Sequence, residues 1–314
     1  MCPASFAPFI DREDMSHAPS IFDSQQLLRQ RERASGHAAA HDFLLQRVSV
    51  DFAGRLDVVR RQFAATLDLG SHHGVIGRML AGRPGVETVI SADTSPGMLA
   101  QCRPPRVLVE LEALPFHEAT FDLVASGLSL QLVNDLPGVL VQIRRCLKPD
   151  GLFLGALIGG STLRELREAF VAAEVEIESG VSPRVAPFAD VRDLGTLLQR
   201  AGFALPVVDA DIVTVAYQTP LHLMREIRNM GAGNMLVERR RQPLRRATLM
   251  RAVEIYTERF ARPDGRVTAT FEILTMTGWC PHESQQKPLQ PGSAKARLAD
   301  ALGVRELKTG DGSG

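Results

Sequence analysis

Residues 66–80 read TLDLGSHHGVIGRML and place a glycine-containing turn between an apolar run and a helical pattern. The run 66–69 predicts a buried strand, and the spacing of apolar residues over 75–80 predicts a helix that Gly82 ends. At such a turn glycine lets the backbone approach a ligand closely, and amides at the helix start can bind a carboxylate or a phosphate. The stretch therefore predicts a nucleotide loop, with Asp68 as a candidate acceptor for a ligand amino group.

A second strand is predicted at 88–92, so that the loop lies within a βαβ unit. Asp93 ends this strand about twenty residues beyond the loop, where an acid binds ribose hydroxyls in dinucleotide-binding and related folds. The structural alternative is an ordinary tight turn, with Asp93 capping the short helix that begins at Pro96. Both features in register favour a nucleotide site.

The α/β rhythm continues along the chain. Strands are predicted at 106–109, 121–126, 152–157, 212–216 and 267–275, with amphipathic helices at 136–147, 163–170 and 191–198. Thr162 and Glu165 have the spacing of a capping box for the second of these helices. We expect a tail at 1–20, N-terminal helices at 21–63, one doubly wound α/β domain at 64–280 with a helical lid insert at 221–260, and a loose tail at 281–314.

Composition narrows the function classes. Lysine plus arginine and aspartate plus glutamate each number 36, and 45% of residues are hydrophobic, which favours an ordinary globule over a nucleic-acid binder. The scattered cysteines show no C-x-x-C spacing, and no apolar run is long enough for a transmembrane segment. His72 and His73 are adjacent without further ligands at a useful spacing, so no metal site is predicted.

The third and fourth strands complete a linked pattern. Glu110 ends the third strand, LEALPF follows at 111–116, and FDLV opens the fourth strand at 121–124. This layout resembles class I methyltransferases dependent on S-adenosyl-L-methionine. The resemblance implies a Rossmann-like, mostly parallel seven-stranded sheet and a cofactor site for S-adenosyl-L-methionine formed by Asp68, Leu69, Gly70, Ser71, His72, Gly74, Asp93, Thr94, Met98, Glu110, Leu111 and Ser126.

A closer resemblance runs through much of the remaining chain. It rests on LSL at 128–130, VNDLP at 133–137, LKPDG at 147–151, GGSTLREL at 159–166 and GW with HESQ at 278–285. These motifs are similar to those of the mitochondrial complex I assembly factor with a methyltransferase fold and its bacterial relatives. That family implies hydroxylation of an arginine on an iron–sulfur subunit of NADH dehydrogenase. The malonyl-carrier-protein methyltransferases of biotin synthesis are a more distant likeness.

Two departures bear on the chemistry. His72 stands where the methyltransferase pattern has the central glycine, and Gln131 with Leu132 stands where the family has His and Trp. No catalytic residue is therefore assigned. Three hypotheses stay open: methyl transfer to an unknown acceptor, arginine hydroxylation in the assembly of NADH dehydrogenase, and a cofactor-free, chaperone-like binding protein.

The expected partner is a protein subunit of NADH dehydrogenase and not a nucleic acid. The arginines of the run 239–251 are either a solvated helix face or a docking surface for an acidic partner. The expected compartment is the cytoplasm of a bacterium, or the mitochondrial matrix if the source is eukaryotic.

Overall fold

The computed structural model describes residues 20–178, 180–188 and 190–285, and the structural statements below concern these residues. Contacts divide the chain into two units, Met1–Pro281 and His282–Gly314. In the second unit, of which residues 282–285 are described, Ser284 Oγ lies 2.7 Å from His282 Nδ1. Most of both predicted tails lies outside the described residues. Every described helix and strand belongs to the first unit.

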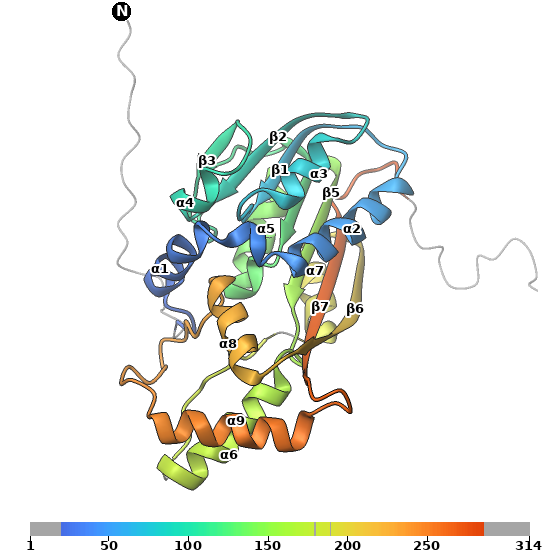
Figure 1. Cartoon of the computed structure of the whole chain (residues 1–314). Coiled ribbons are helices and arrows are strands. Elements are labelled where there is room, and N and C mark those ends of the chain that lie inside the picture. Colours follow the sequence, from blue (N-terminus) through green and yellow to red (C-terminus); the bar gives the residue numbers. More distant parts are fainter. Residues whose placement is uncertain (1–19, 179, 189, 286–314) are drawn as a thin grey trace, which may run out of the picture. The chain divides into compact units, whose positions relative to one another are not determined.

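One sheet of seven strands, in the order β3-β2-β1-β4-β5-β7-β6, forms the framework of the first unit (Figure 1). The strands β1 to β5 run parallel, and β7 is antiparallel to both β5 and β6. The predicted doubly wound, mostly parallel seven-stranded fold is thus confirmed. The strands are β1 (Phe63–Leu69), β2 (Val86–Asp93), β3 (Arg106–Leu108), β4 (Phe121–Gly127), β5 (Leu147–Ile158), β6 (Ala204–Tyr217) and β7 (Val267–Trp279).

Helices cover both faces of this sheet. Before β1 come α1 (Ser24–Ser35), the 3-10 turn η1 (Ala38–Ala40) and α2 (Phe43–Asp57). Between strands lie α3 (Val75–Ala81), α4 (Pro96–Leu99), η2 (Leu130–Leu132), α5 (Leu136–Cys146), α6 (Arg164–Glu178) and α7 (Val191–Arg200). The insert before the last strand forms α8 (Pro220–Asn229) and α9 (Arg246–Phe260), and α9 packs along α6.

Alternation along β5 explains the two cores. Leu152 and Leu154 belong to a cluster that also contains apolar residues of α2, α6 and α9. Phe153 and Leu157 point to the opposite face and pack with residues of α5 and α7. A parallel strand that is buried on both faces reads as a continuous apolar run, as residues 152–158 do.

Strand order also fixes the place of a ligand site. From β1 the chain passes to β2 and β3 on one side, whereas β4 and β5 lie on the other. A crevice forms beyond the carboxyl ends of the strands at such a switch point, and ligands of open α/β sheets bind there. The predicted loop follows β1 directly, so it lies at this point.

The predicted capping box of α6 is wrong. Thr162 and Glu165 both bond to β7 instead of to the start of their own helix. Glu272 N donates to Thr162 Oγ1 at 2.9 Å, and Thr270 Oγ1 donates to Glu165 Oε1 at 2.5 Å. The two side chains thus join α6 to the sheet, because backbone and hydroxyl donors of β7 lie within their reach.

No helix among the described residues is long and apolar enough to cross a membrane.

Candidate functional site

The loop between β1 and α3 requires glycine at two positions. Gly70 has φ 67° and Gly74 has φ 86°, which are left-handed values that favour glycine. A Cβ atom on Gly70 would also collide with the side chain of Ser129. The loop is therefore pressed against the end of β4, as a close backbone approach at the switch point demands.

The amides of this loop bond within the protein. Gly70 N and Ser71 N donate to Ala92 O at 2.7 and 3.0 Å, and Gly74 N donates to Ser71 O at 2.8 Å. His72 N donates to Asp93 Oδ2 at 2.9 Å. These four amides are therefore not free to bind a carboxylate or a phosphate of a ligand, as the sequence had predicted for the loop.

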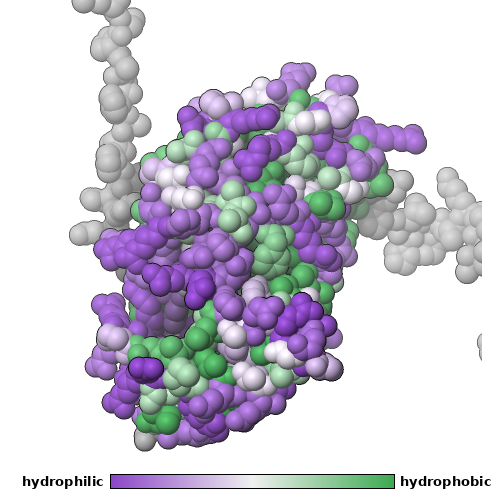
Figure 2. Space-filling view, in the orientation of Figure 1, coloured by the Kyte–Doolittle hydropathy of each residue, from purple (hydrophilic) through white to green (hydrophobic). Residues whose placement is uncertain are grey.

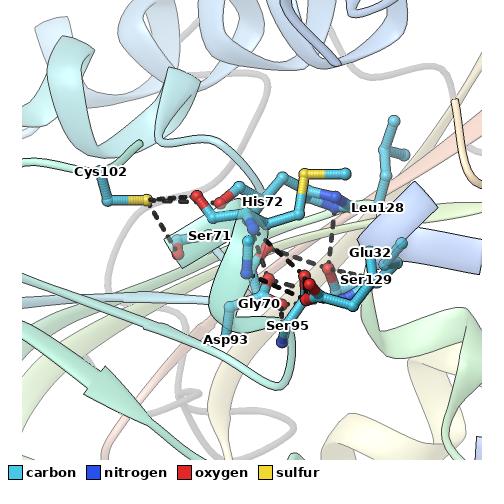
Figure 3. Close-up of polar contacts among 12 residues, drawn as sticks. Glu32, Gly70, Ser71, His72, Asp93, Ser95, Cys102, Leu128 and Ser129 are labelled. Atoms are coloured by element: carbon cyan, nitrogen blue, oxygen red, sulfur yellow. Dashed lines mark hydrogen bonds and ion pairs between the residues drawn. The ribbon is translucent and has the colours of Figure 1, made fainter. Parts of the chain in front are cut away.

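His72 occupies the centre of the site (Figure 3). Its φ is 49°, and its Nε2 lies 3.0 Å from Gly127 O and 2.9 Å from Ser129 Oγ. Since the Ser129 hydroxyl donates to Gly70 O at 3.0 Å, its oxygen accepts from His72, and Nε2 carries the proton. Burial, and next the positive charge of Arg31, lower the pKa of His72 to about 4. His72 is thus neutral near pH 7 and is held by β4.

Asp93 lies at the end of β2, as predicted, but its carboxylate is fully buried and engaged. Oδ1 accepts from Ser95 N at 2.8 Å and Oδ2 from His72 N at 2.9 Å. Arg31 Nη1 approaches the two oxygens to 3.4 and 3.5 Å. Each oxygen of Asp93 thus accepts one short bond from a backbone amide, and the Arg31 guanidinium adds a longer contact to both.

Arg31 is a residue of this site that the sequence analysis did not identify. It comes from α1, is 3% exposed, and also donates from Nη2 to Ser129 Oγ at 3.2 Å. The next residue, Glu32, accepts from Gly97 N at 2.9 Å and from the Ser95 hydroxyl, so α1 is clamped to the start of α4. We call Arg31, His72, Asp93 and Ser129 the Asp93 corner.

Three of the predicted cofactor residues carry buried oxygen atoms without a hydrogen-bond partner. They are Asp68 Oδ1, Thr94 Oγ1 and Ser126 Oγ. The other oxygen of Asp68 accepts from Gly77 N at 2.8 Å, and burial raises the pKa of Asp68 to about 7 while that bond acts in the opposite direction. Unpaired buried oxygens near the ends of β1, β2 and β4 are what a ligand with polar groups would satisfy.

The remaining predicted residues divide between core and surface. Leu69 and Leu111 are buried in the core on the α5 side of the sheet, and Met98 is buried beneath α1. Ser71 is buried, with its hydroxyl 3.5 Å from Cys102 Sγ. Glu110 follows β3, and its backbone forms an isolated β-bridge with Ala113. Its side chain is exposed, so a ligand can reach it from solvent.

The structure thus fits S-adenosyl-L-methionine in part. The unpaired oxygens and the exposed Glu110 suit the predicted contacts to an amino group and an adenine, whereas Asp93, the predicted ribose acid, already has donors within the protein. In this conformation the residues do not fit the complete nucleoside. Within the described part of the chain, no three His, Cys, Asp or Glu side chains are grouped to hold a metal ion.

Four of the six arginines in the run 239–251 form ion pairs. Arg239 bonds to Asp23 at 2.9 Å, Arg240 to Glu178 at 2.9 Å, and Arg251 to Glu176 at 2.6 Å. Arg245 also lies 3.5 Å from Glu178. These ion pairs join the insert to α6 and to the residue that caps α1, so the run is chiefly an internal ionic network.

Comparisons with known proteins agree with this architecture. A methyltransferase domain matches residues 67–155. The mitochondrial arginine-hydroxylase NDUFAF5 of Danio rerio is 40% identical over 312 residues, which cover 96% of this chain and 94% of the relative. The malonyl-[acyl-carrier protein] O-methyltransferase of Gallionella capsiferriformans (strain ES-2) is 32% identical over 277 residues, covering 83% of this chain and 92% of that protein.

A solved structure shares the fold. It is phosphoethanolamine N-methyltransferase 2 of Haemonchus contortus in complex with phosphomonomethylethanolamine and S-adenosylhomocysteine, with a TM-score of 0.52 and 15% identity over 82% of this chain and 61% of that chain. The domain match, the full-length relatives and the solved structure thus all indicate a methyltransferase fold.

Proposed function

The chain belongs to the methyltransferase-fold family that contains the NDUFAF5 arginine-hydroxylases, and from this premise we propose that it hydroxylates an arginine side chain of a protein. The similarity to NDUFAF5 extends over nearly the whole of both chains, so it includes the N-terminal helices and the insert as well as the nucleotide-binding half. Hydroxylation by dioxygen inserts one oxygen atom into a C–H bond and reduces the other to water, so dioxygen and a two-electron reductant must come from outside the chain.

The Asp93 corner carries this proposal. A site built for methyl transfer needs the ribose acid free to bind the methyl donor's nucleoside, yet here Arg31, Ser95 N and His72 N occupy both carboxylate oxygens. His72 departs from the central glycine of the methyltransferase pattern, and Asp93, which matches that pattern, already has donors within the protein. This arrangement supports a reaction other than simple methyl transfer.

Methyl transfer from S-adenosyl-L-methionine is the second candidate. The unpaired oxygens of Asp68, Thr94 and Ser126 favour it, because they lie where the resemblance places the cofactor. When bound, this cofactor supplies an electrophilic methyl group. Asp68 would hold its amino group and Glu110 its adenine, and Arg31 would first have to release Asp93.

The proposed partner is an iron–sulfur subunit of respiratory NADH dehydrogenase. Support for this subunit comes from the motifs that resemble the complex I assembly family, and the mitochondrial arginine-hydroxylase relatives support an arginine as the modified residue. The proposed compartment is the one in which that subunit matures, which is the cytoplasm of a bacterium or the matrix of a mitochondrion.

Mass spectrometry of this subunit tests the proposal. Cells that lack the chain, cells with the parent chain and cells with an Asp93→Asn variant would be compared. We expect an arginine-containing peptide to gain one oxygen atom only with the parent chain. Gain of a methyl group would instead establish the second candidate. An unmodified subunit that still binds the chain would identify a binding protein without chemistry.

A further inference from the structure

A cavity of about 280 Å³ lies between the loop after β1 and the helices that cover it. Its walls are mainly apolar and come from α2, the segment after β4, α6, the loop before α7, and α8; they include Leu45, Leu128, Leu132, Leu163, Phe188 and Met224. In Figure 2 apolar side chains reach the surface in the half of the unit that holds α6, α8 and α9. His72 and Arg31 also line the cavity, which therefore adjoins the Asp93 corner.

The cationic groups that line this cavity are already neutralised. Arg31 is paired with Asp93, as described above. Arg184 Nε donates to Glu174 Oε1 at 2.8 Å, and Glu174 is fully buried. Neither guanidinium is therefore left over for an anionic ligand.

Two acceptors in the same lining have no donor. His73 is 4% exposed, and its Nε2 lies 3.0 Å from Asp42 Oδ2. Because the carboxylate accepts, Nε2 carries the proton, and in the neutral ring Nδ1 is an acceptor. That Nδ1 is buried without a partner.

Gln131, in η2, is the second lining residue with an unpaired acceptor atom. Its Nε2 donates to Leu128 O at 2.8 Å, which identifies the other atom as the oxygen. Gln131 Oε1 is buried without a partner. The Asp42 carboxylate, 14% exposed, also lines the cavity and adds negative charge. Residues of the lining thus carry two buried, unpaired acceptor atoms and a carboxylate among apolar side chains.

A ligand for such a lining must donate hydrogen bonds, carry positive charge and have an apolar stem. The guanidinium of arginine has five donors, no acceptor and a planar shape that can reach separate acceptors at once, whereas the ammonium of lysine is a point charge. Resting on the function proposed above, we propose that Gln131 and His73 bind the guanidinium of the substrate arginine in this cavity, with Asp42 fixing the tautomer of His73.

Binding of small probes tests the assignment. N-acetyl-arginine amide, N-acetyl-citrulline amide and N-acetyl-lysine amide would be titrated into the full chain and followed by NMR. Citrulline keeps the size of arginine but replaces the charged guanidinium with a neutral urea. We expect the arginine probe to bind at least about tenfold more tightly than either of the others, a difference of about 1.4 kcal/mol.

The decisive variant is Gln131→Leu, which removes the unpaired acceptor from the lining. It should weaken binding of the arginine probe about tenfold. Gln199→Leu on the exposed face of α7 is the matched control and should bind like the parent. Circular dichroism of each variant verifies that it is folded.

Several outcomes would overturn the assignment. They are absence of binding by the parent chain, equal binding of arginine and citrulline probes, and unchanged affinity in Gln131→Leu. A loss of S-adenosyl-L-methionine binding alone in that variant would also assign Gln131 to the cofactor and overturn it. If the arginine probe binds as expected but the NADH dehydrogenase subunit is never modified, the proposed hydroxylation fails and the guanidinium site stands.

Discussion

At Asp93 both carboxylate oxygens accept hydrogen bonds from donors of the protein. In the neighbouring cavity lining, Gln131 Oε1 and His73 Nδ1 are buried without a hydrogen-bond donor. Both regions adjoin the loop after β1, and Arg31 and His72 belong to the Asp93 corner and to the cavity lining alike. The difference teaches where a ligand can gain affinity. A ligand gains little affinity at a group whose hydrogen bonds the protein already makes. It gains more at a buried acceptor without a partner, because its donor removes the cost of the missing hydrogen bond.

The largest effect is expected from Asp93→Ala. This change leaves the Arg31 guanidinium buried without its counter-charge, which typically costs about 3–5 kcal/mol of stability. The sequence alone indicates only a ligand contact or a helix cap for Asp93, whereas the buried ion pair makes it a stabilising residue as well. Urea denaturation followed by circular dichroism measures the free energy of unfolding.

Asp57→Ala is the matched control for this change. Asp57 is 67% exposed and pairs with Arg83 at the surface, so its loss should cost about 1 kcal/mol or less. Equal destabilisation by the two variants would show that the Asp93 corner is not energetically distinct.

The next effect concerns pH and Asp68. Burial raises the pKa of Asp68 to about 7 in the folded chain, well above its ordinary value, so the folded state binds the proton more tightly. Its contribution to stability is therefore complete at low pH and is lost as pH rises through about 7, with a slope of at most about 1.4 kcal/mol per pH unit.

His72 acts in the opposite direction, so the difference between variants is what must be measured. Its pKa is lowered to about 4, and its contribution is lost as pH falls from 6.5 toward that value. We expect the unfolding free energy of Asp68→Asn to fall less steeply than that of the parent between pH 4 and about 7. Parallel curves for the two proteins would mean that Asp68 is ionised throughout.

The third prediction opens the Asp93 corner. Arg31→Met keeps much of the apolar stem but removes the donors that hold Asp93, so the ribose hydroxyls of S-adenosyl-L-methionine gain a free acceptor. We expect calorimetry to show affinity about tenfold tighter than that of the parent, equivalent to about 1.4 kcal/mol. Arg29→Met, on the exposed side of α1, is the control and should change nothing. Weaker binding by Arg31→Met would make Arg31 a cofactor contact.

The strand pattern, the loop and the position of Asp93 could be predicted because each depends on residues close together in sequence. Arg31 could not, since it meets Asp93 across 62 positions and belongs to a charged run that is typical of a solvated helix face. One signal was present. Arg31 shares a helix face with Leu27 and Ala34, both buried, so a charge at that spacing required a buried partner.

The capping box at Thr162 and Glu165 was wrong because distant donors of β7 offered the same side chains other partners. The ion pairs of the arginine run likewise involve acids far away in the sequence, and whether the run also docks a partner stays a prediction. Gln131 was set aside because it departs from the family motif, and only the three-dimensional structure shows that its oxygen is buried without a donor.

The smallest effect is expected in the insert. Its ion pairs lie near the surface, whereas the Arg31–Asp93 pair is buried. Arg241 is exposed. A single exposed charge is screened over about 10 Å at 0.1 M salt, so Arg241→Gln should slow association with the iron–sulfur subunit by less than about twofold. Stopped-flow association across a salt series measures this, with Arg200→Gln on α7 as the control. A several-fold slowing at low salt that disappears at high salt, confined to Arg241→Gln, would restore the insert as a docking surface and would show that pairing within the chain does not prevent the remaining arginines from steering a partner.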